Sequence, residues 1–253
     1  MSKTLVIPDI HLQWKKAEKI IAHEGADKII FLGDYFDAFE ETDNDNLITA
    51  QWLIESLGKP NRIHLMGNHD ISYAIPHRSY KCSGYSVYKD YQINSVLKEN
   101  DWKKLKLYTW SDGFLMSHAG VHSYFYEKYI SSEKENEKMP SEFKAWLESI
   151  CEDAMADAWK HRPAAKILQA GMSRGGNELV GGIIWCDSRE FTPIPGIDQI
   201  FGHTPGPKPR FIHSGELNSP EYSTNLALDN YGHSNYYAVI IDMKISIKWI
   251  GDM

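Results

Sequence analysis

Five short segments carry aspartate, histidine or asparagine side chains in patterns that could bind metal ions. In chain order they read D-I-H (9–11), G-D-Y-F-D (33–37), G-N-H-D (67–70), S-H-A-G (117–120) and G-H-T (202–204). Carboxylates held close together repel one another unless a cation lies among them. Oxygen and imidazole ligands without a thiolate favour divalent ions such as manganese, iron, zinc or cobalt. The set offers enough ligands for two ions, an arrangement that can generate a hydroxide nucleophile and bind a phosphoryl oxygen.

Each segment comes at or near the end of a run that is predicted to be a β-strand. The first three runs are predicted at 4–8, 28–32 and 62–66, and apolar residues at helical spacing predict helices between them, at 12–24 and 42–57. This β-α-β-α-β opening indicates an α/β fold. Because the carboxyl ends of parallel strands meet along one edge of a sheet, we expect the five segments to converge there. Later strands are predicted at 113–116, 182–185, 199–201, 225–228, 236–241 and 245–250.

The rest of the chain is expected to surround this core as part of one domain spanning residues 1–253. Regularity fades after residue 71, and the tyrosine-rich stretch 73–91 is predicted to be a surface loop. Helices are expected within 121–162, interrupted by a charged loop, and five glycines fall within residues 171–182. We therefore predict lid or insertion segments around 71–112 and 121–182.

Composition excludes several classes of protein. With 253 residues, 42% of them hydrophobic, the chain can bury a sizeable core, and its net charge of −7 argues against a non-specific nucleic-acid binder. Cys82, Cys151 and Cys186 form no C-x-x-C pair, so neither a disulfide framework nor a thiolate zinc site is indicated. No stretch approaches the roughly 20 apolar residues of a membrane span. We expect a cytoplasmic protein with no membrane partner.

Each motif is weak when taken alone. A single histidine such as His118 or His203 is more often a hydrogen-bonded core or surface residue than a ligand, and Asp9-x-His11 alone resembles an ordinary turn. The order of the five motifs and their shared position at strand ends are what favour a metal site.

Together, the five motifs resemble those of the calcineurin-like metallophosphoesterases, over residues 9 to 204. The resemblance implies a four-layer α/β/β/α sandwich with two mixed β-sheets and an inserted helical and loop region. It implies two divalent ions, manganese foremost, with iron, zinc, cobalt or nickel as alternatives. By motif, Asp9 and His11 would hold the first ion, Asp34 would bridge both, and the second would be completed by Asn68, His118 and His203.

The same resemblance assigns the chemistry. A hydroxide bridging the two metals would attack phosphorus, and His69 would act as a general acid that protonates the leaving group. Asp70 would orient the ring of His69 and favour its protonated form.

The last motif indicates a branch of the family. Many phosphodiesterases and nucleases continue it as G-H-x-H, whereas this chain has Pro205 there and is more similar to the phosphoprotein phosphatases and symmetrical diadenosine tetraphosphatases. That branch uses arginines to bind substrate phosphate, and Arg189 is the candidate. The Arg-Gly that usually follows G-D-x-x-D is absent after Asp37, and Arg78 is a possible substitute. The stretch 226–232 matches a late family motif only loosely and gives no site residue.

The expected partner is a phosphorylated small molecule, a nucleotide or a phosphoprotein, and the acidic charge argues against nucleic acid. Three alternatives stay open. One is a cyclic-nucleotide phosphodiesterase or nuclease of the same superfamily, another is a catalytically inactive binding scaffold, and the third is a purely structural α/β domain. The last would leave the clustered carboxylates unexplained.

Overall fold

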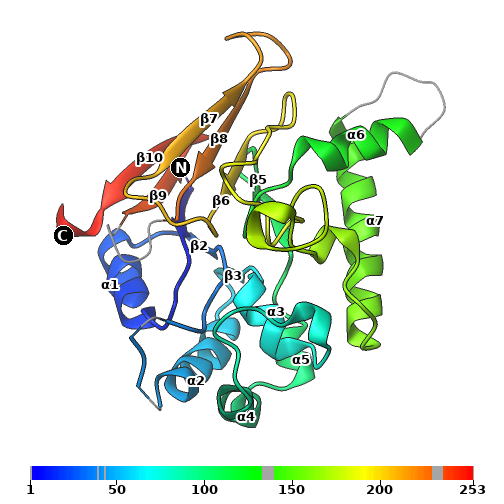
Figure 1. The fold of residues 1–253 in the computed structure, drawn as a ribbon. Coiled ribbons are helices and arrows are strands. Elements are labelled where there is room, and N and C mark those ends of the chain that lie inside the picture. The colour runs from blue at the N-terminus through cyan, green and yellow to red at the C-terminus, as the bar shows by residue number, and fades with distance from the viewer. Residues whose placement is uncertain (1, 39, 43, 133–139, 230–235, 253) are drawn as a thin grey trace.

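Two five-stranded mixed β-sheets pack against each other in the computed structural model, which describes residues 2–38, 40–42, 44–132, 140–229 and 236–252 (Figure 1). The first sheet has the strand order β10-β9-β1-β2-β3 and the second has the order β4-β5-β6-β8-β7. The strands are β1 (Lys3–Ile7), β2 (Lys28–Phe31), β3 (Arg62–His64), β4 (Tyr108–Ser111), β5 (Phe114–Ser117), β6 (Gln199–Phe201), β7 (Arg210–Ser214), β8 (Ser223–Ala227), β9 (Tyr236–Ile241) and β10 (Lys244–Trp249).

Alternation along β1 and β2 explains why both faces of the first sheet are buried. Successive side chains of a strand point to opposite faces, so Leu5 and Phe31 pack on the helical side while Val6 and Ile30 pack against the second sheet. The strands β1, β2 and β3 are parallel, and β9 and β10 extend the sheet beyond β1 by antiparallel pairing. Parallel pairing brings the carboxyl ends of β1, β2 and β3 to one edge, as the sequence predicts.

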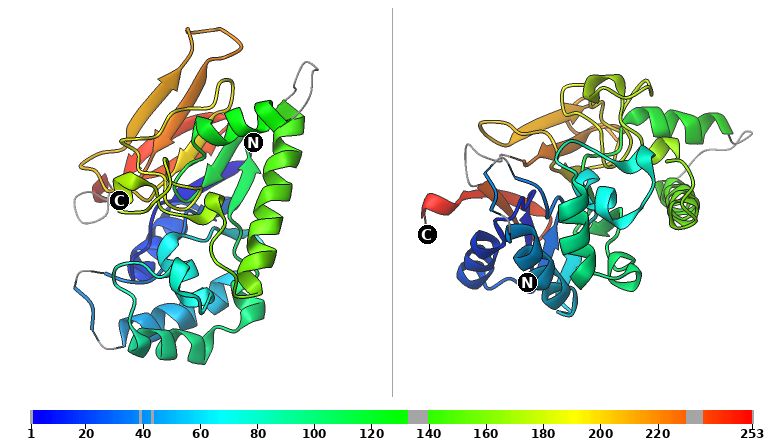
Figure 2. Two further views of the ribbon diagram at one scale, coloured as in Figure 1. Left: turned by 45° about the vertical axis from the view of Figure 1, so that its right-hand side comes forward. Right: turned by 60° about the horizontal axis from the view of Figure 1, so that its bottom comes forward.

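Helices cover the outside of the sheets. The α-helices are α1 (Trp14–Glu24), α2 (Asp45–Leu57), α3 (Asn68–Ala74), α4 (Val87–Val96), α5 (Glu99–Trp102), α6 (Ser123–Ser132) and α7 (Pro140–Trp159), and the short 3-10 turns are η1 (Arg78–Tyr80), η2 (Lys166–Leu168), η3 (Met172–Arg174) and η4 (Ile250–Asp252). Figure 2 shows α7 running alongside the second sheet, where Lys144 lies over the ring of Trp110. This arrangement confirms the predicted metallophosphoesterase-type fold. Within the described residues, no helix combines the length and apolar character needed to cross a bilayer.

Several predicted elements differ from the structure. The predicted strand 182–185 is a turn, and the predicted loop 73–91 contains η1 and the start of α4. β4 and β7 were not predicted, since both lie at edges of the second sheet and carry mixed polar and aromatic residues. Most of the predicted charged loop, 133–139, lies outside the described residues. The division into a core with insertions at 71–112 and 121–182 stays a prediction.

Candidate metal centre

Asp34 lies at the centre of two groups of side chains that could each hold a metal ion. One group combines Asp34 with Asp9 and His11, and the other combines it with His118 and His203; within each group the ligand atoms lie within 4.8 Å of one another. Asp34 Oδ2 is 3.8 Å from His11 Nε2 and 3.3 Å from His118 Nε2. The structure therefore brings together residues from the ends of β1, β2, β5 and β6, with Asp34 in the position of a shared ligand.

The second group has the donor atoms and spacings that a cation requires. His118 Nδ1 donates to the Leu32 carbonyl at 2.9 Å, so Nε2 is the ring nitrogen that faces the other ligands. This atom lies 3.1 Å from Asn68 Oδ1 and 3.2 Å from His203 Nδ1. Two ligands bonded to one tetrahedral ion at ~2.0–2.1 Å lie ~3.3 Å apart, which matches these distances. The residues present therefore fit a divalent metal.

Two motif glycines allow the carboxylates to approach the neighbouring loops. A Cβ on Gly67 would lie 2.0 Å from Asp34 Oδ1, and a Cβ on Gly202 would lie 2.0 Å from Asp9 Oδ1. Any side chain at these positions would displace a predicted ligand. Asp34 itself adopts a left-handed conformation with φ of 49°, which is uncommon outside glycine and typical of functional sites. The glycine in G-N-H-D and G-H-T is thus required by close packing against a carboxylate.

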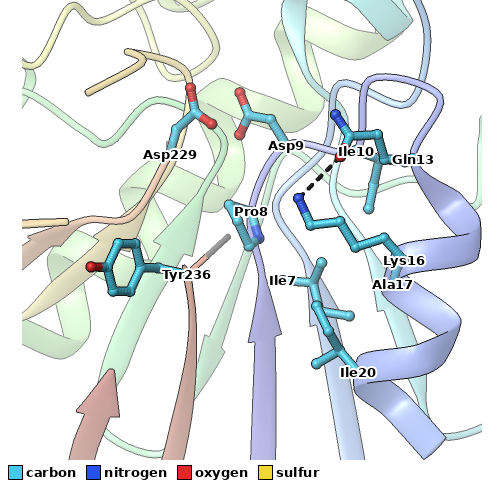
Figure 3. A pocket seen from close by; sticks show the side chains of 10 residues that line it. All are labelled: Ile7, Pro8, Asp9, Ile10, Gln13, Lys16, Ala17, Ile20, Asp229 and Tyr236. Carbon is cyan, nitrogen blue, oxygen red and sulfur yellow. Dashed lines mark hydrogen bonds between the residues drawn. The ribbon is translucent and has the colours of Figure 1, made fainter. Parts of the chain in front are cut away.

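The pKa values of Asp9 and Asp34 are shifted in opposite directions. Burial raises the pKa of Asp9, and the nearby carboxylates of Asp229 and Asp34 raise it further. Burial also acts to raise the pKa of Asp34, but the positive charges of His118 and His69 outweigh it and hold this pKa below its usual value. Figure 3 shows Asp229 pointing toward Asp9, with Lys16 of α1 bonded to Gln13 beside them. Asp229, to which the sequence assigned no role, adds a carboxylate beside the predicted metal ligands.

The predicted contact between Asp70 and the ring of His69 is not formed, and this prediction is wrong. Asp70 is fully buried and its two oxygens accept the backbone N–H groups of Asp34, Tyr35 and Gly67 at 2.7–2.8 Å. Asp37 replaces it, since its Oδ2 lies 2.7 Å from His69 Nδ1. Asp70 instead links the loop that carries Asp34 to the start of α3 by hydrogen bonds. Accepting three N–H groups explains why position 70 needs a carboxylate.

His69 lies at the rim of the predicted metal centre. Burial lowers its pKa, but the carboxylate of Asp34 and the hydrogen bond that His69 Nδ1 donates to Asp37 raise it to about 12. The imidazolium form is therefore favoured at neutral pH. Asp37 is fixed by further partners: its Oδ1 accepts from Tyr73 Oη at 2.6 Å and from Lys89 Nζ at 2.8 Å. Because Nδ1 of His69 is bonded to Asp37, Nε2 is left to face a ligand.

A cavity of about 350 Å³ opens over these residues. Its lining includes His11, Asp34, Asn68, His69 and His203 on the metal side, together with Asp37, Ala38, Ser83, Gly84, Arg174, Trp185 and Pro205. Arg174 is the arginine on this wall, where its Nε lies 2.8 Å from Asp187 Oδ2 and its Nη2 donates to Thr204 Oγ1 at 3.0 Å. The cavity is of the size that binds small ligands.

The two arginines expected to contact phosphate are placed differently. The Arg189 guanidinium is bound to both oxygens of Asp187, at 2.8 Å each, and its side chain is 71% exposed. Arg78 is exposed in η1, and neither residue lines the cavity. Sequence reasoning missed Arg174, although it stands between Ser173 and two glycines in the glycine-rich segment. It also left Asp37, the second aspartate of G-D-Y-F-D, without a role.

A family model for calcineurin-like phosphoesterases matches residues 2–207, which is most of the chain. The chain belongs to this family. As a calcineurin-like phosphoesterase it is a hydrolase that acts on phosphoesters with divalent metal ions. The Asp and His groups around Asp34 are the residues that could hold those ions. A search of curated proteins gives no significant match.

Solved structures similar to this phosphoesterase support its fold. A point mutant of a cold-active protein tyrosine phosphatase is 16% identical, with a TM-score of 0.58 over 98% of this chain and 78% of that chain. The protein tyrosine phosphatase of a psychrophilic Shewanella species is 15% identical, with a TM-score of 0.55 over 98% and 80%. A protein serine/threonine phosphatase from Saccharomyces cerevisiae is 14% identical, with a TM-score of 0.50 over 98% and 79%.

Proposed function

We propose that this phosphoesterase hydrolyses a phosphomonoester, a phosphoprotein or a dinucleoside polyphosphate at a centre of two divalent ions, manganese foremost. The observation that carries the proposal is the convergence of the predicted ligands on Asp34, with His69 and the cavity beside them. Asp9, His11 and Asp34 would hold one ion, and Asp34, Asn68, His118 and His203 the other. When bound, the ions supply Lewis acidity that lowers the pKa of an attacking water and neutralises the phosphoryl oxygens.

The chain's own residues supply the proton and the orientation. His69 Nε2 donates a proton to the leaving-group oxygen, while Asp37 holds the ring through Nδ1 and stabilises its charged form. Asp70 keeps the loop of Asp34 in place through three backbone bonds. Asp37 thus takes the orienting role that the sequence assigned to Asp70.

Arg174 is the residue on this wall best placed to bind a substrate phosphate. Its guanidinium lines the cavity and is held by Asp187 and Thr204, so it is pre-oriented at little cost in entropy. We expect Arg174→Ala to raise KM for a phosphomonoester about 10-fold, because a charged hydrogen bond to substrate is lost. The matched control is Arg189→Ala, which removes the other partner of Asp187 and should change KM less than Arg174→Ala does. An equal effect of both variants would assign the phosphate contact to neither.

The alternative within the family, a cyclic-nucleotide phosphodiesterase or nuclease, is disfavoured by Pro205. This residue lines the cavity at the position where those enzymes place a second histidine, and proline offers no side-chain ligand. The experiment is hydrolysis of a panel by the manganese-loaded protein: a phosphopeptide, diadenosine tetraphosphate, a cyclic nucleotide and single-stranded DNA. We expect one of the first two to have the highest kcat/KM. Fastest cleavage of the cyclic nucleotide or the DNA would establish the alternative.

A further inference from the structure

A third group of potential ligands lies beside the predicted catalytic centre and has a different chemistry. It consists of Asp37, His69 and Cys82, whose ligand atoms also lie within 4.8 Å of one another. Within the described residues it is the one such group that includes a thiol. Thiolate, imidazole and carboxylate are together the ligands that zinc prefers, whereas the two groups around Asp34 contain no sulfur.

The spacing of the three atoms is close to that of ligands on one zinc ion. Cys82 Sγ lies 3.6 Å from His69 Nδ1. In a tetrahedral site with bonds of ~2.3 Å to sulfur and ~2.0–2.1 Å to nitrogen, these two atoms lie ~3.5 Å apart. The distance from His69 Nδ1 to Asp37 Oδ2 is 2.7 Å, a hydrogen bond that would open by ~0.6 Å to admit an ion.

The surrounding residues hold the three ligands in place and leave the site accessible. Tyr73 and Lys89 bind Oδ1 of Asp37, which aims Oδ2 at His69. The segment after Cys82 is pressed onto Asp37, since a Cβ on Gly84 would lie 2.9 Å from its Cγ. Asp37, His69 and Gly84 line the cavity, and Cys82 is half-buried, so an ion and one water ligand can enter from solvent.

We propose that Asp37, His69 and Cys82 form an inhibitory site for zinc or a similar thiol-binding divalent cation, separate from the catalytic ions. Binding replaces the Nδ1 proton of His69 and the thiol proton of Cys82, both of which pass to solvent, and forms metal bonds to nitrogen and sulfur. The ring of His69 is then a neutral imidazole bound to the metal through Nδ1. Loss of its remaining proton, at Nε2, would leave an imidazolate. Such a ring is a weaker acid, so turnover falls. This last consequence rests on the proposed role of His69, but binding does not.

The test is a titration of the metal-free full-length protein with Co²⁺, read by absorption without substrate. We expect three equivalents to bind, the weakest of them producing a near-ultraviolet thiolate-to-cobalt charge-transfer band. Cys82→Ser should bind two equivalents and lose the band, and Cys82→Ala should do the same. Cys151→Ala removes a buried thiol of α7 and should keep both the third equivalent and the band. Absence of the band from the parent protein, or its persistence in Cys82→Ser, would overturn the site.

Inhibition provides a second readout. Added zinc should lower the activity of the manganese-loaded protein, and Cys82→Ser should need at least ~10-fold more zinc for the same fractional loss, since even outer-shell changes at metal sites have effects of that size. Identical zinc sensitivity in the parent protein and both Cys82 variants would contradict an inhibitory role. Binding of two equivalents without the band would leave the catalytic centre intact and refute only the third site.

Discussion

The two ends of β1 carry buried carboxylates with opposite surroundings. At the amino end, Glu24 of α1 has a side chain only 2% exposed and is bonded to Lys3 at 2.5 Å, Lys248 at 3.2 Å and Tyr237 at 2.7 Å. At the carboxyl end, Asp9 after β1 and Asp34 after the neighbouring β2 have ion pairs only with histidines among the described residues. The chain supplies its own cations at the first end. At the second it gathers anionic and imidazole ligands and leaves the positive charge to bound metal.

The pKa shifts express the same difference. Burial acts to raise the pKa of Glu24, but its bonds to Lys3, Tyr237 and Lys248 outweigh this and lower it to about 2. The pKa of Asp9 is raised by burial and by its carboxylate neighbours. One end of the strand is therefore arranged for stability, and the other accepts an unfavourable charge distribution that a cation relieves.

The largest effect is expected from Asp34→Asn. Loss of the shared ligand should weaken both ions and lower kcat/KM for a phosphomonoester by about 10⁴-fold or more, because metal stabilisation of the transition state is worth several kcal/mol. Metal analysis should show reduced content. Manganese at 100 times its Kd should stabilise the parent protein by about 2.7 kcal/mol and the variant by much less. A variant that retained two ions and full activity would remove Asp34 from the centre.

His69→Ala should have the next largest effect and should separate acid catalysis from metal binding. We expect kcat to fall by about 10³-fold on an alkyl phosphate while the two catalytic ions stay bound, since general acids contribute on that scale. An aryl phosphate with a good leaving group needs no proton, so its kcat should fall much less. Equal losses on both substrates would refute the acid role.

Glu24→Gln should affect stability and leave activity unchanged. The substitution removes the charge that pairs with Lys3 and Lys248, and we expect the free energy of unfolding to fall by about 2 kcal/mol, the scale of a charged buried hydrogen bond. Urea denaturation with a chelator present measures this without interference from metal. Loss of kcat per folded molecule in this variant would show that the two ends of β1 are not independent.

A smaller effect is expected in how the stability difference between the parent protein and Glu24→Gln changes with pH. The pKa of Glu24 is lowered from 4.5 to about 2 on folding. Between these values Glu24 is protonated in the unfolded chain but still ionised in the folded protein, so stability falls with pH. The stability contributed by Glu24 is complete above pH 4.5 and is lost as the pH falls toward 2. The gap in unfolding free energy between the parent protein and Glu24→Gln should therefore narrow over that range. A constant gap would mean that the ion pairs are not its cause.

The sequence predicted the metal end of β1 better than the surroundings of the site. Ligand motifs at the ends of β1 and β2 place Asp9 and Asp34 together because parallel strands of one sheet share an edge, whereas His118 reaches them from β5 of the second sheet. Which carboxylate bonds to the ring of His69 depends instead on the conformation of the loops. The sequence assigned Asp70, the next residue, as the partner of His69, and only the folded loops show that Asp37 reaches the ring instead.

The same limit explains the arginines and the irregular elements. Arg174 and Arg189 both lie near Asp187 in space, and their side-chain directions decide which one faces the cavity. The predicted strand 182–185 is apolar because it packs beneath the site: Ile183 and Ile184 are fully buried within a turn. Burial gives turns and strands the same apolar signature, so periodicity cannot separate short examples of the two.

The measurement that tests the central claim most directly is anomalous diffraction from crystals of the protein grown with manganese. The account predicts two peaks ~3.5–4 Å apart, as in two-metal sites, with the Asp34 carboxylate between them. Asp9 and His11 should contact one peak, and Asn68, His118 and His203 the other. A map with no peak at Asp34, or with a single ion bound elsewhere while the protein remains fully active, would contradict it.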